Sequence, residues 1–235
     1  MPTGLSGTIL VMVASLPRIG RSQAPLRALP GGQAVPDVGA DSDEKLIEAF
    51  ENGDRQVAGK LYDKLIGIVD CTLYRILGAR GHDHDDLVQS AFEQIILTLA
   101  RRRFARACSL SSWAGTVTTH LALNVLRART RERSVIDRQQ DPALEAPSRR
   151  PDDDVERAAG TREELARLRE HLARIKPEKA EALILHDVLG HELAEVAVLT
   201  GVSITAAQSR LLRGRRELQR RVAAQMARAA RKGGP

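Results

Sequence analysis

The sequence predicts an all-α protein made of two helical modules joined by a flexible linker. Aromatic residues make up only 3% of the 235 residues, and other strand signals are scarce. Apolar residues recur instead at helical spacing in several segments. A stretch rich in proline and mixed charge divides these segments into two groups. With 43% hydrophobic residues, the chain can bury one or two aliphatic cores.

Residues 1–40 are predicted to form a disordered tail, because glycine and proline are too frequent there for a regular element. Its apolar run, Ile9 to Leu16, follows no basic residue and is too short to cross a bilayer, so we expect no targeting signal and no membrane association.

Cys71 and Cys108 have no CxxC partner. We expect both to be reduced and the protein to be cytoplasmic.

The first module is predicted to span residues 41–135. Asp41 and Ser42 can cap a first helix that runs to Phe50, and a turn then leads to a helix over residues 55–77. Glycines at 78 and 81 end that helix. Two further helices are expected over residues 86–103 and 112–129, each with apolar residues along one face.

An acidic and imidazole cluster, residues 82–86, precedes the third helix. His82, Asp83, His84 and Asp86 could be read as the metal site of a hydrolase. Adjacent residues in the first turn of a helix splay around its axis, however, and acids at a helix N-terminus are explained by the helix dipole. The chain offers no nucleophile or phosphate loop either. We therefore expect no metal, no cofactor, no small-molecule substrate and no enzyme activity.

The helix over residues 112–129 carries packing residues on one face and polar residues on the other. Trp113 is a lone large aromatic at helical spacing, for which burial is the simplest explanation. The outward residues combine hydroxyl, imidazole, amide and guanidinium groups, which suit capture of unstacked bases and of the nucleic-acid backbone. They include Thr116, Thr119, His120, Asn124, Arg127 and Arg129.

Residues 136–160 are predicted to be the linker, since prolines and mixed charges interrupt the helical pattern. The second module, residues 161–225, begins with Thr161 as a helix cap and Glu164 in the capping-box position. Pro177 starts the next helix, which is expected to run to Val188. These two helices should pack behind the last pair to complete a four-helix module.

The last pair reads as a helix-turn-helix. Its first helix starts near His191, and the turn falls at Gly201, where glycine tolerates a left-handed backbone. Ser203 is placed to cap the second helix. Four apolar residues are expected to point inward from that helix: Ile204, Ala207, Leu211 and Leu218.

Polar side chains cover the other face of this second helix and match the groups that read base edges and bind phosphates. We assign DNA binding to Ser203, Thr205, Gln208, Ser209, Arg210 and Arg213. The alternative is an ordinary helical hairpin with a solvated basic face.

The net charge is +6 with a pI near 9.8, and residues 210–232 hold nine basic residues against one acid, Glu217. This placement favours phosphate contacts. Residues 226–235 are predicted to be a basic tail.

Five strings in order resemble the extracytoplasmic-function group of bacterial RNA polymerase sigma factors. They are LYDKLIGIVD at 61–70, DDLVQ with Phe92 at 85–92, Trp113, LALNVLRAR at 121–129 and SRLLRGRREL at 209–218. The resemblance implies a sigma factor that binds core RNA polymerase, recognises promoter DNA and helps to open it. An anti-sigma partner is implied in the same way.

The resemblance also implies roles for particular residues. Asp86, Leu87, Gln89 and Phe92 would dock on core polymerase. The helix-turn-helix would read an upstream promoter element. The downstream, minus-ten element would be opened by Trp113, Thr116, His120, Asn124, Arg127 and Arg129.

Several positions depart from the family pattern and bear on base preference and on melting. They are Ala114, Gly115, Thr119, His120, Asn124 and Gln208. An amide at Gln208, where the family often has lysine, pairs better with adenine.

The second functional reading is a stand-alone helix-turn-helix regulator that binds an operator as a dimer. The chain shows no heptad pattern or long apolar edge to build such a dimer.

Overall fold

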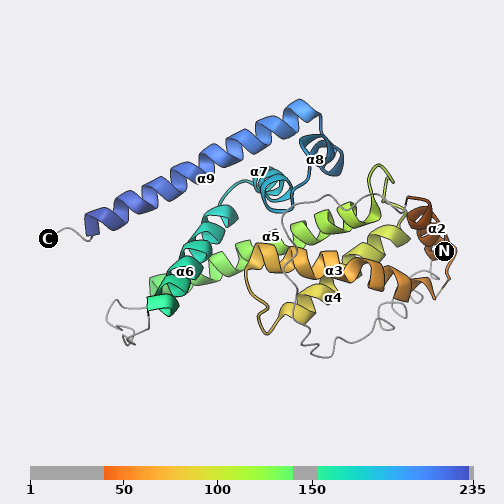
Figure 1. The fold of residues 1–235 in the computed structure, drawn as a ribbon, viewed down its shortest axis with the longest axis horizontal. Coiled ribbons are helices and arrows are strands. Elements are labelled where there is room, and N and C mark those ends of the chain that lie inside the picture. The colour runs from red at the N-terminus through yellow and green to blue at the C-terminus, as the bar shows by residue number, and fades with distance from the viewer. Residues whose placement is uncertain (1–39, 55, 140–152, 233–235) are drawn as a thin grey trace.

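The computed structural model describes residues 40–54, 56–139 and 153–232, and every regular element within these ranges is a helix (Figure 1). The predicted all-α fold with two helical modules is confirmed. Residues 1–39 of the predicted tail and residues 140–152 of the predicted linker lie outside the described residues.

Four helices build the first module. They are α2 (Ala40–Glu51), α3 (Val57–Leu77), α4 (His84–Ala100) and α5 (Leu110–Gln139). Helix α3 packs against both α4 and α5. The core consists of aliphatic side chains and the rings of Phe50 and Phe92; the aliphatic members include Leu61, Leu65, Val69, Leu73, Ile95, Leu99 and Leu123. Burial of such side chains contributes about 1.5–3 kcal/mol each, which is the main force that holds these helices together.

A polar cluster fixes the connection between α3 and α4. Gly78 ends α3 in a left-handed conformation, with φ of 86°, as predicted. Arg80 donates to Asp70 through Nε at 3.0 Å, and Nε2 of the buried His84 lies 2.7 Å from the same carboxylate. Burial raises the pKa of Asp70, but the hydrogen bonds from Arg80 and His84 outweigh it and hold that pKa below its ordinary value. Asp83 is paired separately, with Arg129 at 2.6 Å. The sequence cluster at residues 82–86 therefore organises a turn.

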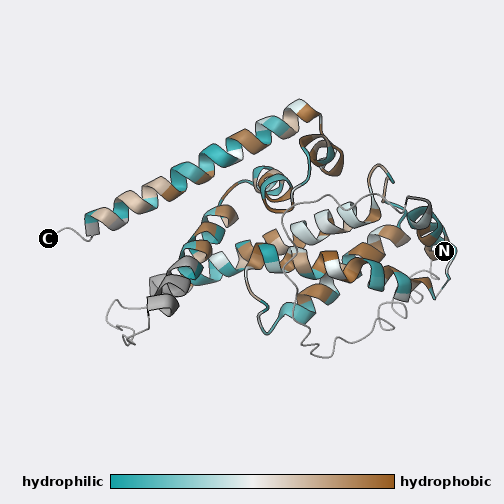
Figure 2. Ribbon diagram, viewed as in Figure 1, coloured by the Kyte–Doolittle hydropathy of each residue, from teal (hydrophilic) through white to brown (hydrophobic). Residues whose placement is uncertain are grey.

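The second module contains α6 (Asp153–Ala173), α7 (Pro177–Leu183), the π-helix η1 (Ile184–Val188), α8 (Leu193–Thr200) and α9 (Ile204–Lys232). Pro177 occupies the first turn of α7, as predicted. The core of this module is formed by leucine, isoleucine, valine and alanine side chains: Ile175, Ala180, Leu183, Ile184, Leu185, Val196, Ala197, Ala207 and Leu211. Figure 2 shows apolar residues gathered in α3 and α4, and hydrophilic residues along much of α9.

Three helices are longer than the sequence predicts. Helix α5 continues to Gln139 and α9 to Lys232, so residues 226–232 are helical. Helix α6 starts at Asp153, which places Thr161 inside the helix and makes its predicted capping role wrong. These extensions are rich in Arg, Glu, Gln and Ala, which are strong helix formers, and they contain no proline.

The two modules contact each other in this structure. Helix α5 packs along α6, α7, η1 and α8, and α3 contacts η1. Figure 1 shows α7 between α9 and the first module. The long helix α9 thus lies on the side of the second module that faces away from α3 and α5.

Candidate nucleic-acid interface

The turn between α8 and α9 is built by the residues that the sequence singled out. Gly201 ends α8 with φ of 65°, a left-handed conformation that glycine adopts without steric cost. Oγ of Ser203 accepts a hydrogen bond of 3.2 Å from the backbone N–H of Ala206, which satisfies one of the unpaired donors of the new helix. Both predictions are confirmed, and together they fix where α9 begins.

The predicted reading face lies on the outer side of α9. Thr205, Gln208 and Arg213 are exposed, as is Ser203, while Ser209 and Arg210 are half-buried. Ala207 and Leu211 are buried as predicted, but Ile204 is 54% exposed and its predicted inward position is wrong. Ile204 is the first residue of the helix, where the chain has not yet reached the core. The structure therefore brings the six candidates together around the first turns of α9.

Gly214 allows α9 to approach α7 closely. A Cβ atom added at this position would lie 3.1 Å from two atoms of Leu183 and 3.1 Å from the backbone oxygen of Lys179. The backbone oxygen cannot move aside as a flexible side chain can. The packing of α9 against α7 therefore depends on the absence of a side chain at position 214.

We expect Gly214→Ala to lower the free energy of unfolding by about 1–3 kcal/mol, the usual cost of overpacking, despite the helix propensity of alanine. The measurement is a urea titration of the full chain. Gly67→Ala is the matched control, because an added Cβ on α3 there meets nothing within 4 Å. That control should gain about 0.5–1 kcal/mol. Equal behaviour of the two variants would contradict the close approach.

The predicted strand-opening residues of α5 have different surroundings. Thr116 is 4% exposed, and its hydroxyl donates to the backbone oxygen of Ser112 at 3.0 Å. The predicted outward position of Thr116 is therefore wrong, and its direct contact with DNA stays a prediction that this burial does not favour. Trp113 is half-buried, with its ring centroid 4.8 Å from that of Phe104.

Thr119 is 0% exposed and its hydroxyl donates to the backbone oxygen of Gly115 at 2.8 Å, so its predicted outward position is wrong. The other four α5 candidates reach the surface at least in part. Asn124 is exposed and accepts a hydrogen bond of 3.4 Å from Arg127, whose Nη2 atom is buried without a hydrogen-bond partner. Burial lowers the pKa of Arg127, and the nearby Glu178 opposes that effect. Arg129 is held by Asp83 at the α3–α4 turn. His120 is exposed and is paired with Glu181 of α7.

Carboxylates of the second module lie along the side of α5 that carries Ser112 and His120. Oγ of Ser112 donates to Glu195 of α8 at 2.7 Å, and Glu181 of α7 pairs with His120. Three more polar contacts join the modules: Arg75 to the backbone oxygen of Val188, Arg169 to that of Ile76, and Arg133 to Glu170. Sequence reasoning missed Glu181 and Glu195, because nothing local shows which surface an exposed glutamate will meet.

Raising the pH is expected to loosen the contact between the modules. The hydrogen bond to Glu181 raises the pKa of His120, against the opposing effects of burial and of Arg127. A raised pKa means that this contact stabilises fully below the ordinary histidine pKa of about 6.5 and is lost as pH rises through the raised value. Small-angle scattering should show a radius of gyration that increases over that window. His120→Gln should abolish the dependence, and an unchanged profile in that variant would contradict the assignment.

The predicted polymerase-docking residues lie on α4. Asp86 and Gln89 are exposed, and Leu87 is half-buried. Phe92 is 1% exposed, and its ring centroid lies 4.7 Å from that of Tyr62. The ring thus belongs to the core that positions α4, and a direct contact of Phe92 with polymerase stays a prediction that this burial does not favour.

Comparisons with known proteins follow the same division of the chain. Residues 61–132 match the family described as Sigma-70 region 2, and residues 165–218 match the one described as Sigma-70, region 4. The chain is 27% identical over 192 residues to the ECF RNA polymerase sigma factor SigE of Mycolicibacterium smegmatis, which covers 81% of this chain and 67% of that protein. A solved structure titled "Structure of CnrH in complex with the cytosolic domain of CnrY" aligns with a TM-score of 0.47 and 21% identity, over 77% of this chain and 97% of that one.

Within the described residues, no helix is both long and apolar enough to cross a membrane.

The region 2 match covers the segment from α3 to α5, and the region 4 match covers the helix-turn-helix. A stand-alone helix-turn-helix regulator would lack the segment that matches region 2. The chain belongs to the sigma-70 family as an extracytoplasmic-function sigma factor, a non-enzymatic subunit that binds core RNA polymerase and promoter DNA to initiate transcription.

Proposed function

We propose that three separate surfaces of this sigma factor divide the work of initiation. Asp86, Leu87 and Gln89 on α4 dock on core polymerase. The outer face of the first turns of α9 reads an upstream duplex element. The side of α5 that carries His120, Asn124 and Arg127 holds the opened strand downstream. Residues 41–135 and 161–225 act as the two modules, and residues 136–160 connect them.

The observation that carries this division is that the two DNA surfaces differ in their acidic partners. Thr205, Gln208 and Arg213 face solvent from α9, whereas the exposed His120 is paired with Glu181 of α7. Two carboxylates, Glu181 beside His120 and Glu195 beside Ser112, occupy the side of α5 that an anionic DNA strand would approach. The free chain can therefore offer its reading face at once, but α5 must separate from α7 and α8 before it meets DNA.

Phe92, Thr116 and Trp113 support these surfaces from within. Phe92 anchors α4 in the core, and the Thr116 hydroxyl is used within α5. Trp113 packs on Phe104 at the start of α5, where it fixes the helix relative to the preceding loop. Their roles are positional, and substitution would act on DNA or polymerase through the fold.

Holoenzyme reconstituted on a promoter fragment tests the assignment of α5. Asn124→Ala and Arg127→Ala are expected to reduce permanganate reactivity of unpaired thymines while the upstream footprint stays intact. Lys60→Ala, an exposed residue of α3 outside the proposed surfaces, is the matched control. Loss of the upstream footprint with normal strand opening would contradict the division.

Location in the cytoplasm and a protein partner that holds the factor inactive also belong to the proposal. Both rest on membership of the family. A partner of this kind that bound α4 or the covered side of α5 would block polymerase docking or strand capture.

A further inference from the structure

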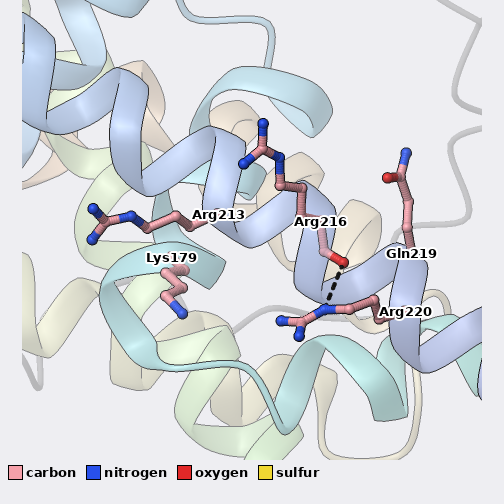
Figure 3. A pocket seen from close by; sticks show the side chains of 5 residues that line it. All are labelled: Lys179, Arg213, Arg216, Gln219 and Arg220. Atoms are coloured by element: carbon pink, nitrogen blue, oxygen red, sulfur yellow. Dashed lines mark hydrogen bonds between the residues drawn. The ribbon is translucent and has the colours of Figure 1, made fainter.

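A basic cleft of about 620 Å³ lies between α7 and α9. Lys179 lines it from α7, and Arg213, Arg216, Gln219 and Arg220 line it from α9 (Figure 3). Gln219 and Arg220 lie beyond the part of the chain that matches region 4, which ends at residue 218. The cleft thus combines two helices and extends past the predicted reading face.

The guanidinium groups of this cleft are available to a ligand. Within the described residues, Arg213 and Arg216 have no acidic partner, and Arg220 uses only Nε, which donates to the backbone oxygen of Arg216 at 3.4 Å. Lys179 is held at the cleft by Glu217 at 2.9 Å. Hydrogen bonds from Lys179 and Arg221 lower the pKa of Glu217, so its carboxylate stays ionised and keeps the ammonium in place.

Other arginines of α9 are used inside the protein. Arg215 donates through Nε to Asp187 of η1 at 3.0 Å. Arg221 donates to Glu217 and to the backbone oxygen of Arg174, each at 3.1 Å. Arg215 and Arg221 are thus neutralised within the module, whereas the three arginines of the cleft have no acidic partner among the described residues.

The length of α9 indicates what the cleft would meet on DNA. Arg213, Arg216 and Arg220 are spaced at i, i+3 and i+7, so they share a helix face. From Thr205 to Arg220 the helix rises about 22 Å, whereas the major groove is about 12 Å wide. A helix whose first turns lie among the bases therefore reaches the backbone at the groove wall by the time it arrives at the cleft.

We propose that this cleft clamps the phosphate backbone of the duplex beside the element that α9 reads. Lys179, Arg216 and Arg220 bind phosphate oxygens, Gln219 can donate its amide to the same strand, and none of the four reads a base. The inference rests on the proposed reading role of α9. It adds a positioning site whose loss weakens binding to all sequences alike.

Salt dependence provides the test, with Arg216→Gln and Arg220→Gln made separately in the full chain. Holoenzyme reconstituted with each variant is bound to a pool of randomised duplexes at several salt concentrations. Each lost phosphate contact should reduce the slope of log K against log salt by about 0.9, so that a fourfold rise in salt costs the variant about 3.5-fold less affinity than the wild type. The sequences selected from the pool should stay the same.

Arg228→Gln is the matched control, an exposed arginine of the same helix about 12 Å beyond Arg220. Its slope should equal that of the wild type. Unchanged slopes for both cleft variants would overturn the proposal, as would a changed sequence preference. Normal DNA binding with weaker binding to core polymerase would overturn it too, by assigning the cleft to an acidic protein surface. If Gln208→Ala leaves sequence selection unchanged, the reading role of α9 fails instead, which is a separable result. Thermal unfolding followed by circular dichroism confirms that each variant is folded.

Discussion

Replacing Phe92 by alanine is expected to lower the free energy of unfolding of the first module by about 3–5 kcal/mol. The ring is 1% exposed and packs against Tyr62, so its removal leaves a cavity between α3 and α4. Neighbouring helices can fill such a cavity only in part. Urea titration of the full chain, followed by helix content, measures the loss. Binding to core polymerase should fall only to the extent that the module unfolds.

Asp86→Ala and Gln89→Ala separate docking from folding. Both side chains are exposed on α4, so each variant should keep its unfolding free energy within about 0.5 kcal/mol of the wild type. Their affinity for core polymerase should nevertheless fall. A Phe92→Ala protein of normal stability that fails to bind polymerase would contradict this account, because it would make the ring a direct contact.

Gln208→Ala is expected to relax promoter selection at one base pair and to leave polymerase binding intact. The amide is exposed on α9, where it can donate to and accept from the edge of an adenine. A good bidentate contact of this kind discriminates against the wrong base by about 1–3 kcal/mol. Selection from a randomised duplex pool by the reconstituted holoenzyme measures the change.

Arg228→Gln serves again as the control, since it is exposed on α9 outside the reading face. It should select the same sequences as the wild type. A uniform loss of affinity in Gln208→Ala, with no change in base preference, would assign Gln208 to the backbone and contradict its reading role.

Local chemistry predicted the parts of this structure that depend on neighbouring residues alone. The left-handed glycine at Gly201, the Ser203 cap and the Pro177 helix start were all found, because each satisfies a backbone requirement within a few residues. The lengths of α5 and α9 were not found. Arginine runs resemble solvated helix ends in sequence, yet arginine is itself a strong helix former and can extend a helix.

The candidate sites were predicted less completely than the fold. Periodicity placed Thr116 on the outward face of α5, and the family resemblance alone offered Phe92 as a docking contact; both side chains are buried in the structure. The pairing of His120 with Glu181, which lies sixty-one residues away, has no local signal at all. The basic cleft at Lys179 likewise could not be predicted from sequence, because it forms only where α7 and α9 pack together.

Start-site selection by purified core polymerase tests the central claim most directly. Run-off transcription on genomic templates should give discrete start sites with the wild-type chain that core polymerase alone does not use. An Asp86→Ala, Gln89→Ala double variant should lose these start sites together with co-purification, whereas Gln208→Ala should co-purify and shift the set of sites. A wild-type chain that neither co-purifies with core polymerase nor changes start-site choice would contradict the account.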